Sequence, residues 1–368
     1  MTVHTATTFE VRLDDPLGSS RLLTETLREP EPGEIVLEVE RFGLTSNNLT
    51  YALLGNETPT RYWDAFPAAD GWGRVPAWGS ARVIDGDESV ARPGERFVGL
   101  LPMADRFVFA GRRAEDGVLV GSATGRNAMP SMYRDLHRVE DEDAAQGSAA
   151  EVLLRPFFTF AALLAREVSD GGAETAVVTS ASSKAGLLLG RLLQQGGVRT
   201  VGLTAAPRVA ATESTGAFTE VRSYSDVSGL TAEGRTVLLD IAGNAEVSSA
   251  VARQLSDDLA RIIVVGATHH DAAAGAAEPD DSPSPEVDLF DTAEHEAGYS
   301  EEHGAAALRA LEDDAREALL PWASRWIQLD EVEGVGSLEE AWRTVQEPPA
   351  SPLRGIVVTA SPRRGDPR

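Results

Sequence analysis

The sequence contains no cysteine, which excludes disulfide bonds and the thiolate zinc sites of many dehydrogenases. Its six histidines lack the i, i+4 spacing on a helix that is typical of a metal site. His269 and His270 stand at the end of a predicted strand, whereas His295 and His303 lie in an acidic stretch that we interpret as a solvated helix. We therefore expect catalysis without a metal.

Long apolar runs are also missing, and basic residues are few. No run approaches the ~20 apolar residues of a membrane helix. The first residues, MTVHTATTFEVRLDD, lack the basic start and apolar core of a secretory signal. With 58 acidic against 33 basic residues, the net charge is −25, and a field of this sign repels nucleic acid and anionic membranes. These features predict a cytoplasmic protein with an acidic, solubilising surface and a small-molecule substrate.

The length and the hydrophobic patterns indicate two domains. The chain has 368 residues, and single cores stop growing at about 250–300. Residues 9–125 read as short strands in which apolar and charged residues alternate, as in GEIVLEVERFGL. From about residue 150 onward, the runs TAVVTS, RTVGLT, TVLLDIAG and RIIVVGA alternate with predicted helices, which favours a parallel sheet. Residues 270–288 are rich in Ala, Ser, Pro and acids, and we expect a mobile loop there.

Three stretches in this order resemble the medium-chain dehydrogenase/reductase superfamily, of the zinc-free quinone oxidoreductase and enoyl reductase kind. They are PEPGEIVLEVERFGLTSNNLTYALLG (31–55), VTSASSKAGLLLGRLLQQGGVRTVGLT (178–204) and the pair VLLDIAGN and RIIVVGAT, which are similar to the fourth and fifth strands of the family's sheet. The tail SLEEAWRTVQ…LRGIVVTA resembles the segment that returns to the N-terminal domain. The resemblance implies a GroES-like, mostly β domain over 1–150, a doubly wound Rossmann domain over 151–320 and a return segment over 321–368 that completes the first domain. The stretch YWDAFPAADGWGRVPAWG (62–79) is more similar still to a subgroup of that superfamily without an assigned function.

The stretch TSASSKAG (179–186) lies between a predicted strand and helix, where a dinucleotide-binding protein has its glycine-rich phosphate loop. Zinc-free members of the superfamily typically read Gly-Ala-Ser-Gly-Gly-Val-Gly here, and only Gly186 is retained. Ser180, Ser182 and Ser183 can donate hydroxyl groups to a phosphate, and Lys184 adds a positive charge at a helix N-terminus. Alternatively, the serines at 182 and 183 simply cap the helix, and the loop no longer binds a nucleotide.

The residues after the second predicted strand favour NADP(H) over NAD(H). Thr204 and Arg208 stand where an NAD-dependent enzyme normally has a carboxylate for the ribose, and a guanidinium suits a phosphate. Tyr224 matches a tyrosine that NADPH-dependent relatives often carry near the 2′-phosphate. Asn244 is a weak candidate for the nicotinamide side, and Gly266 for close approach of the cofactor. The alternative for Arg208 is an ordinary solvated helix residue.

Without a metal, hydride transfer needs a side chain that polarises or protonates the substrate. In the resembling families this residue lies in the loop that here reads TSNNLTY (45–51). Tyr51 is the first candidate for the general acid, and Asn48 occupies the position where members of these families often have an acid or asparagine near the nicotinamide. The alternatives are a packed aromatic at 51 and a turn residue at 48.

Aromatic residues are concentrated in residues 62–78, interleaved with charged ones. Such a segment can wall an apolar substrate cleft, or it can be an Ω-like loop packed by its own side chains. A second cluster, MPSMYRDLHRV (129–139), is predicted to close the same cleft. The candidate substrate-binding residues are Trp63, Phe66, Trp72 and Tyr133.

These features predict a zinc-independent, NADPH-dependent reductase that transfers hydride to a carbonyl or activated C=C bond of a small, partly apolar substrate. The alternative is a cofactor-independent enzyme or small-molecule-binding protein that kept the fold but lost dinucleotide chemistry, and the missing loop glycines favour it. Relatives often dimerise through the sheet edge of the Rossmann domain, so the resemblance implies a homodimer.

Overall fold

The computed structural model of the chain describes residues 3–57, 60–114, 116–139, 149–265, 285–347 and 351–361. The chain forms two compact units. Unit 1 comprises Met1–Arg155, Gln328–Pro349 and Arg354–Arg368, and unit 2 comprises Pro156–Ile327 and Ala350–Leu353. Gly266, a predicted cofactor contact, and the histidines at 269 and 270 lie outside the described residues.

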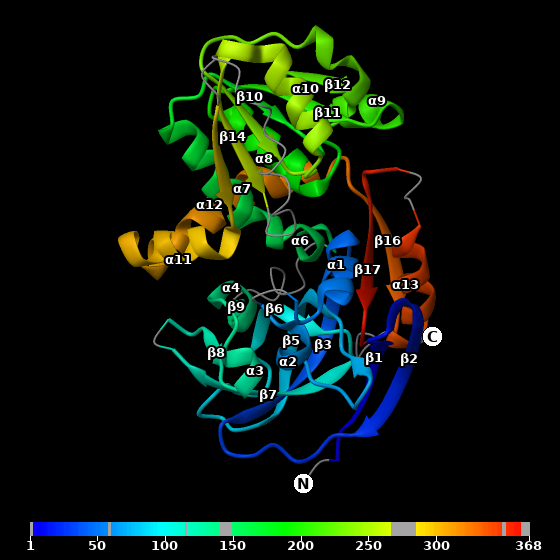
Figure 1. The fold of residues 1–368 in the computed structure, drawn as a ribbon. Coiled ribbons are helices and arrows are strands. Elements are labelled where there is room, and N and C mark those ends of the chain that lie inside the picture. Colours follow the sequence, from blue (N-terminus) through cyan, green and yellow to red (C-terminus); the bar gives the residue numbers. More distant parts are fainter. Residues whose placement is uncertain are drawn as a thin grey trace. The chain divides into compact units, whose positions relative to one another are not determined.

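Unit 1 is built around a closed six-stranded antiparallel barrel (Figure 1). The strands follow the order β3-β5-β6-β9-β8-β7, and β7 pairs back onto β3, which leaves no free edge in the ring. Ile35, Leu37 and Val39 of β3 are fully buried, as their alternation with charged residues predicts. The strands are β3 (Glu34–Leu44), β5 (Pro76–Gly86), β6 (Arg96–Pro102), β7 (Arg106–Arg113), β8 (Leu119–Gly121) and β9 (Leu136–Val139).

The C-terminal segment completes this unit. β17 (Arg354–Thr359) pairs antiparallel with β3, and β16 (Gln328–Glu333) pairs parallel with β17. The chain between these two strands forms α13 (Leu338–Gln346). Its Trp342 is fully buried, with its ring centroid 5.5 Å from that of Phe9. A separate three-stranded sheet has the order β2-β1-β4, from β1 (Thr5–Arg12), β2 (Asp15–Thr26) and β4 (Trp72–Gly73).

The short helices of unit 1 carry several of the candidate residues. They are α1 (Ser46–Leu54), α2 (Tyr62–Ala65), α3 (Thr124–Asn127), α4 (Ser131–Arg134) and α6 (Ala149–Leu154).

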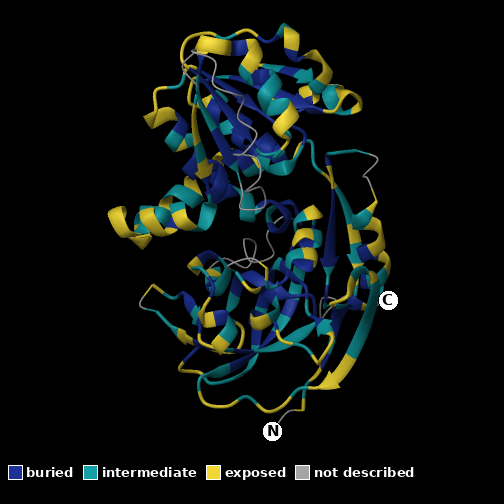
Figure 2. Cartoon of the chain, viewed as in Figure 1, coloured by how far each residue is buried: buried dark blue, intermediate teal, exposed yellow. Residues whose placement is uncertain are grey.

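Unit 2 contains a parallel six-stranded sheet of order β12-β11-β10-β13-β14-β15. The order reverses between β10 and β13, which is the switch point at which doubly wound sheets bind ligands. Figure 2 shows the central strands buried between helices. The strands are β10 (Thr175–Val178), β11 (Arg199–Thr204), β12 (Glu220–Ser223), β13 (Thr236–Asp240), β14 (Leu259–Val265) and β15 (Glu286–Phe290).

The helices of unit 2 form two groups. α7, α8, α11 and α12 pack against one another, whereas α10 packs against β13 and the 3₁₀ segment Tyr224–Gly229. The helices are α7 (Pro156–Asp170), α8 (Lys184–Gln195), α9 (Val209–Ser214), α10 (Ala245–Leu255), α11 (Thr292–His303) and α12 (Ala305–Ala323).

The sheet has two strands that the hydrophobic runs did not reveal, β12 and β15. The expectation of a mobile loop over residues 270–288 is wrong for Glu286–Asp288, which belong to β15 and pair with β14; the earlier part of that stretch is outside the described residues. Among the described residues, we find no helix that is long and apolar enough to cross a membrane.

Candidate active site

The serine-rich loop follows β10 and is fixed to both neighbouring strands. The Thr179 N–H donates to Leu239 O (3.0 Å) on β13, and the Ala181 N–H donates to Leu203 O (3.0 Å) on β11. The loop therefore lies at the carboxyl end of the sheet, at the switch point. This is where the sequence placed it.

A buried carboxylate supports the base of the loop. Asp240, at the end of β13, accepts hydrogen bonds from the Thr179 hydroxyl (2.8 Å), the Gly243 N–H (3.0 Å) and the Ser248 hydroxyl (2.6 Å). The Thr179 hydroxyl in turn accepts from the Ala242 N–H (2.9 Å). Because three donors satisfy the buried carboxylate, it acts as a rigid support for the loop.

Each loop serine is held in a different way. Ser180 adopts a left-handed conformation with φ 52°, which normally favours glycine. Ser182 is buried, and its Oγ accepts a hydrogen bond from the Thr204 hydroxyl (2.9 Å). Ser183 caps α8, since its Oγ accepts from the Gly186 N–H (3.0 Å). The capping alternative is thus correct for Ser183, and the hydroxyl groups of Ser182 and Thr204 satisfy each other.

Gly186 is the one loop position where a side chain has no space. A Cβ there would lie 2.6 Å from Ser180 O and 3.0 Å from the Ala181 Cα. This contact brings the first turn of α8 against the loop, which is the packing role of the third glycine in Rossmann loops. The glycine that the sequence retains is therefore the one that the backbone requires.

Lys184 is the first residue of α8 and is half-buried. Desolvation by burial lowers the pKa of its ammonium group to about 8. The positive end of the helix also disfavours a cation here and favours an anion. An anion bound at this helix start would favour the charged form of the lysine.

Arg208 and Tyr224 lie beside the loop on the β11–β12 side. The Tyr224 hydroxyl accepts a hydrogen bond from the Ser180 N–H (2.9 Å). Burial raises the Tyr224 pKa, with the negative charge of Asp240 adding to the rise, while that hydrogen bond and the positive charge of Arg208 oppose it. Arg208 makes no side-chain ion pair with any residue that the structure describes.

Asn244 caps α10 and is exposed. Its Oδ1 accepts from the backbone N–H groups of Glu246 (3.1 Å) and Val247 (3.2 Å). This accounts for an asparagine at the position, and its predicted contact with the nicotinamide side stays a prediction.

In unit 1, Asn48 is buried and serves as a helix cap. Its Oδ1 accepts from the Thr45 N–H (2.7 Å) in a capping box, and its Nδ2 donates to Pro76 O (2.9 Å). Asn48 therefore joins the start of α1 to β5. The alternative of a turn residue at position 48 comes near to the observed capping role, because both are local backbone contacts. A direct part of Asn48 in catalysis stays a prediction.

Tyr51, on the same helix, lies in a cluster of aromatic rings. Its ring centroid is 4.6 Å from that of Tyr62, Tyr62 is 6.2 Å from Tyr133, and Tyr133 is 6.1 Å from Trp78. Burial raises the pKa of the Tyr51 hydroxyl, and interactions with Trp78 and Asn47 only partly oppose this rise. The hydroxyl thus keeps its proton at neutral pH, as a proton donor must.

Of the four predicted substrate-binding residues, the structure brings only Tyr133 into this cluster. Trp63 packs against Gly55 and Gly73, where its ring fills the space that a Cβ would need. Phe66 is buried in the core, 5.3 Å from the Arg126 guanidinium.

Trp72 lies on the separate three-stranded sheet, where the Arg21 guanidinium covers its ring at 3.8 Å. The aromatic segment is therefore divided between several environments.

Comparison with known proteins identifies the family. Residues 42–349 match a family model described as "Protein of unknown function (DUF2855)". The chain belongs to this family. No curated protein matches its sequence.

Solved structures share the fold of this DUF2855 protein. CurA from Vibrio vulnificus in complex with NADPH aligns with a TM-score of 0.61 at 15% identity, over 98% of this chain and 100% of its own. The quinone oxidoreductase from Coxiella burnetii aligns with a TM-score of 0.62 at 12% identity, over 97% and 100%. CurK enoyl reductase aligns with a TM-score of 0.57 at 14% identity, over 97% and 99%. At these identities the likeness establishes the fold, and it confirms the predicted fold class.

Sequence reasoning missed Tyr62, Trp78 and Arg126 as candidate residues. Arg126 is buried, and it donates to Arg134 O (2.8 Å) and Leu100 O (2.8 Å), which holds the backbone around α4. Desolvation lowers its pKa to about 10. The high aromatic content of residues 62–78 was the available signal for Tyr62 and Trp78, whereas no local pattern distinguished Arg126 from a surface arginine.

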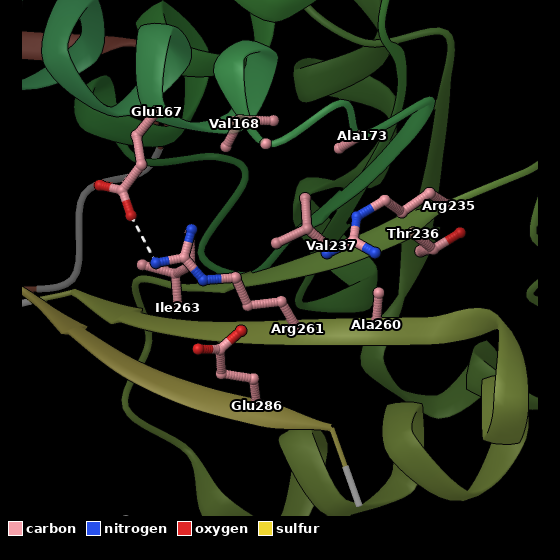
Figure 3. A pocket seen from close by; sticks show the side chains of 11 residues that line it. Glu167, Val168, Ala173, Arg235, Thr236, Val237, Ala260, Arg261, Ile263 and Glu286 are labelled. Carbon is pink, nitrogen blue, oxygen red and sulfur yellow. Dashed lines mark hydrogen bonds and ion pairs between the residues drawn. The ribbon is translucent and has the colours of Figure 1, made fainter. Parts of the chain in front are cut away.

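Unit 2 also has a cavity of about 230 Å³ at the end of its sheet opposite to the serine-rich loop, between α7 and strands β13 to β15 (Figure 3). Arg261 lies in its wall and donates to Glu167 (2.6 Å). Arg235 and Glu286 complete the charged lining, and Val168 and Val237 are apolar. This cavity lies at the amino ends of the strands and contains none of the predicted site residues.

No group of three potential metal-ligating side chains occurs in the described part of the chain.

Proposed function

We propose that this protein is an NADPH-dependent oxidoreductase that works without a metal and reduces a carbonyl or activated C=C bond of a small, partly apolar substrate. The observation that carries the proposal is the combination of a helix N-terminus that bears Lys184, at the switch point of the sheet, with the guanidinium of Arg208 after β11, which forms no ion pair with the described residues. That CurA of the same fold was solved with NADPH adds support.

The residues present fit a phosphorylated dinucleotide. The N–H of Ala185 has no acceptor within α8, because it belongs to the first turn, and it can therefore donate to a diphosphate bound beside Lys184. Arg208 and Tyr224 border the end of β11, which is followed by Ala-Ala-Pro rather than by a carboxylate. A 2′-phosphate bound there would meet the positive charge of Arg208.

When bound, NADPH would supply the hydride. Tyr51 would supply the proton: burial keeps its hydroxyl protonated, so it can hydrogen-bond to the substrate oxygen and give up the proton as charge develops there. Asn48 would act indirectly: its hydrogen bonds hold α1 against β5, which fixes the direction in which the Tyr51 side chain points. The surrounding rings exclude water, which strengthens such a hydrogen bond.

A second candidate function, binding of a small molecule without dinucleotide chemistry, is favoured by one observation. In the loop, the Ser180 N–H already has the Tyr224 hydroxyl as its acceptor, and the Ser183 hydroxyl is engaged in the helix cap. A loop whose donors are internally satisfied binds phosphate less well than one with free donors.

We also propose a homodimer formed through β15. This strand is the edge of the described sheet, and it exposes Val287 and Leu289, about half of each side chain being accessible (46% and 51%). Exposed apolar residues on an edge strand invite pairing with a second strand. Size-exclusion chromatography with light scattering on Val287→Glu should show a monomer if the edge forms the interface, and an unchanged mass would contradict it.

The proposed function is tested by titrating the protein with NADPH and with NADH and measuring heat. We expect NADPH to bind at least tenfold more tightly, with the preference lost in Arg208→Ala and both affinities reduced in Lys184→Ala. Arg235→Ala is the matched control, since this exposed arginine lies at the amino ends of the strands, away from the serine-rich loop. Absence of binding by either nucleotide at millimolar concentration would reject the oxidoreductase and favour the second candidate.

A further inference from the structure

Ser180 has a backbone conformation that normally belongs to glycine. Its φ of 52° is left-handed, which a residue with a Cβ adopts rarely and glycine adopts easily. Ser180 stands where zinc-free members of the superfamily have the first glycine of the loop, the residue that makes the tight turn. Contacts with the rest of the protein must therefore hold this serine in the conformation that a glycine would adopt unaided.

The conformation of Ser180 affects the start of α8. Its carbonyl oxygen accepts a hydrogen bond from the Ser183 N–H (2.8 Å), and Ser183 is the cap of the helix. The same oxygen lies 2.6 Å from the place that a Cβ of Gly186 would occupy. If Ser180 relaxed to an ordinary negative φ, its carbonyl group would turn and these contacts would change. The helix start that bears Lys184 therefore depends on the backbone of Ser180.

The hydroxyl group of Tyr224 holds the amide side of Ser180. The Ser180 N–H donates to this hydroxyl (2.9 Å). Tyr224 follows β12 directly, and its ring packs against the hydrophobic cluster that includes Val201 and Leu203 of β11. Because the core holds the ring, the hydroxyl is a fixed acceptor for the Ser180 N–H. A phenylalanine at this position would pack in the same way and offer no acceptor.

We propose that Tyr224 is a positioning residue of the loop: its hydroxyl holds Ser180 in the left-handed conformation and thereby gives the loop the turn that the first glycine gives a Rossmann loop. This inference rests on the proposed function for its ligand. Tyr224 acts on the diphosphate through Ser180 and the start of α8. Its removal therefore affects NADPH and NADH alike, since both nucleotides contain the same diphosphate and only NADPH has a 2′-phosphate.

The test compares the nucleotide affinities of the wild type, Tyr224→Phe, Ser180→Gly and the double variant by calorimetry. We expect Tyr224→Phe to weaken NADPH and NADH by the same factor, about 5- to 20-fold, because binding must then restore the strained conformation of Ser180. In the Ser180→Gly background the same replacement should cost less than about twofold, since glycine adopts the turn unaided. Tyr299→Phe is the matched control, because it removes the hydroxyl group of another half-buried tyrosine of unit 2, on α11.

Two kinds of result would overturn the inference. A loss of affinity for NADPH alone, or an equal loss with and without Ser180→Gly, would mean that Tyr224 contacts the nucleotide itself. Unchanged affinity in Tyr224→Phe would mean that the hydroxyl is dispensable for the loop. Higher affinity would mean that the hydroxyl competes with a phosphate oxygen for the Ser180 N–H.

A measurement without nucleotide separates this inference from the proposed function. The backbone chemical shifts of Ser180, recorded by NMR on serine-labelled protein and identified by the signal that Ser180→Gly removes, should indicate the left-handed conformation in the wild type and in Tyr299→Phe. Tyr224→Phe should lose this signature. If neither nucleotide binds to any of the proteins, the oxidoreductase is rejected and the chemical shifts alone decide: a left-handed Ser180 in Tyr224→Phe would overturn the inference.

Discussion

The lowered pKa of Lys184 predicts that NADPH affinity depends on pH in an unusual range. An ordinary lysine stays charged up to about pH 10, but burial brings the pKa of Lys184 to about 8 in the free protein. A diphosphate next to the ammonium favours its charged form and raises its pKa again. Binding is therefore accompanied by proton uptake above pH 8, and affinity falls as the pH rises through the pKa of the free protein.

The size of the effect follows from the charged fraction. With a pKa of about 8, roughly nine tenths of the lysine is charged at pH 7 and about one tenth at pH 9, so affinity should fall about tenfold over this interval. Other groups change little: the 2′-phosphate has lost its second proton already above about pH 6, and burial raises the pKa of Tyr224 beyond its ordinary value.

The assay is a calorimetric titration of NADPH at pH 7, 8 and 9 in buffers of two ionisation enthalpies, which reveals proton uptake directly. Lys184→Arg should bind with little dependence on pH, because a guanidinium stays charged, and Lys184→Ala should bind weakly at every pH. A flat profile for the wild type between pH 7 and pH 9, without proton uptake, would refute the reasoning, since it would mean that the ammonium group does not meet the diphosphate.

Four further predictions concern single side chains. Ser180→Gly should raise the free energy of unfolding in urea by up to about 1 kcal/mol, because the left-handed φ of 52° strains a serine. Gly186→Ala should lower it by about 1–3 kcal/mol in the same assay, since the new Cβ would lie 2.6 Å from Ser180 O. Asn48→Ala should cost about 2 kcal/mol in urea unfolding through the lost cap and the unpaired, buried Pro76 O. Tyr51→Phe should reduce kcat with an accepted substrate by about 10²–10⁴-fold and leave the dissociation constant of NADPH unchanged in calorimetry.

The parts of the fold that the sequence predicted are those encoded by local patterns. The alternation of Ile35, Leu37 and Val39 with charged neighbours predicted a half-buried strand, and all three side chains are fully buried in β3. The apolar run TAVV followed by TSASSKAG indicated a strand, a tight turn and a helix, and β10 and α8 lie there. Such patterns can be recognised in the sequence because the polarity of each residue indicates whether its side chain is buried or exposed.

The missed parts depend on partners far away in the sequence. β15 contains Glu286 and Asp288 and exposes most of its side chains, so no apolar run marks it; it is a strand because β14 offers backbone partners. Trp72 was grouped with its neighbours in sequence, but its ring is covered by Arg21 of β2. Tyr51 and Tyr62 meet because the Tyr62 N–H donates to Gly55 O (3.1 Å), which holds α2 beside the end of α1, and no spacing along one helix or strand encodes that contact.

The loss of glycines from the loop is weaker evidence against nucleotide binding than the sequence suggests. Glycine is needed where a Cβ would collide, and the loop retains it at 186, where the collision would occur. The serine at 183 has an ordinary backbone conformation and turns its hydroxyl into the helix cap. At the helix start, Lys184 and the positive end of α8 both attract an anion, which supports the proposal that this loop binds the diphosphate of a nucleotide although it has only one glycine.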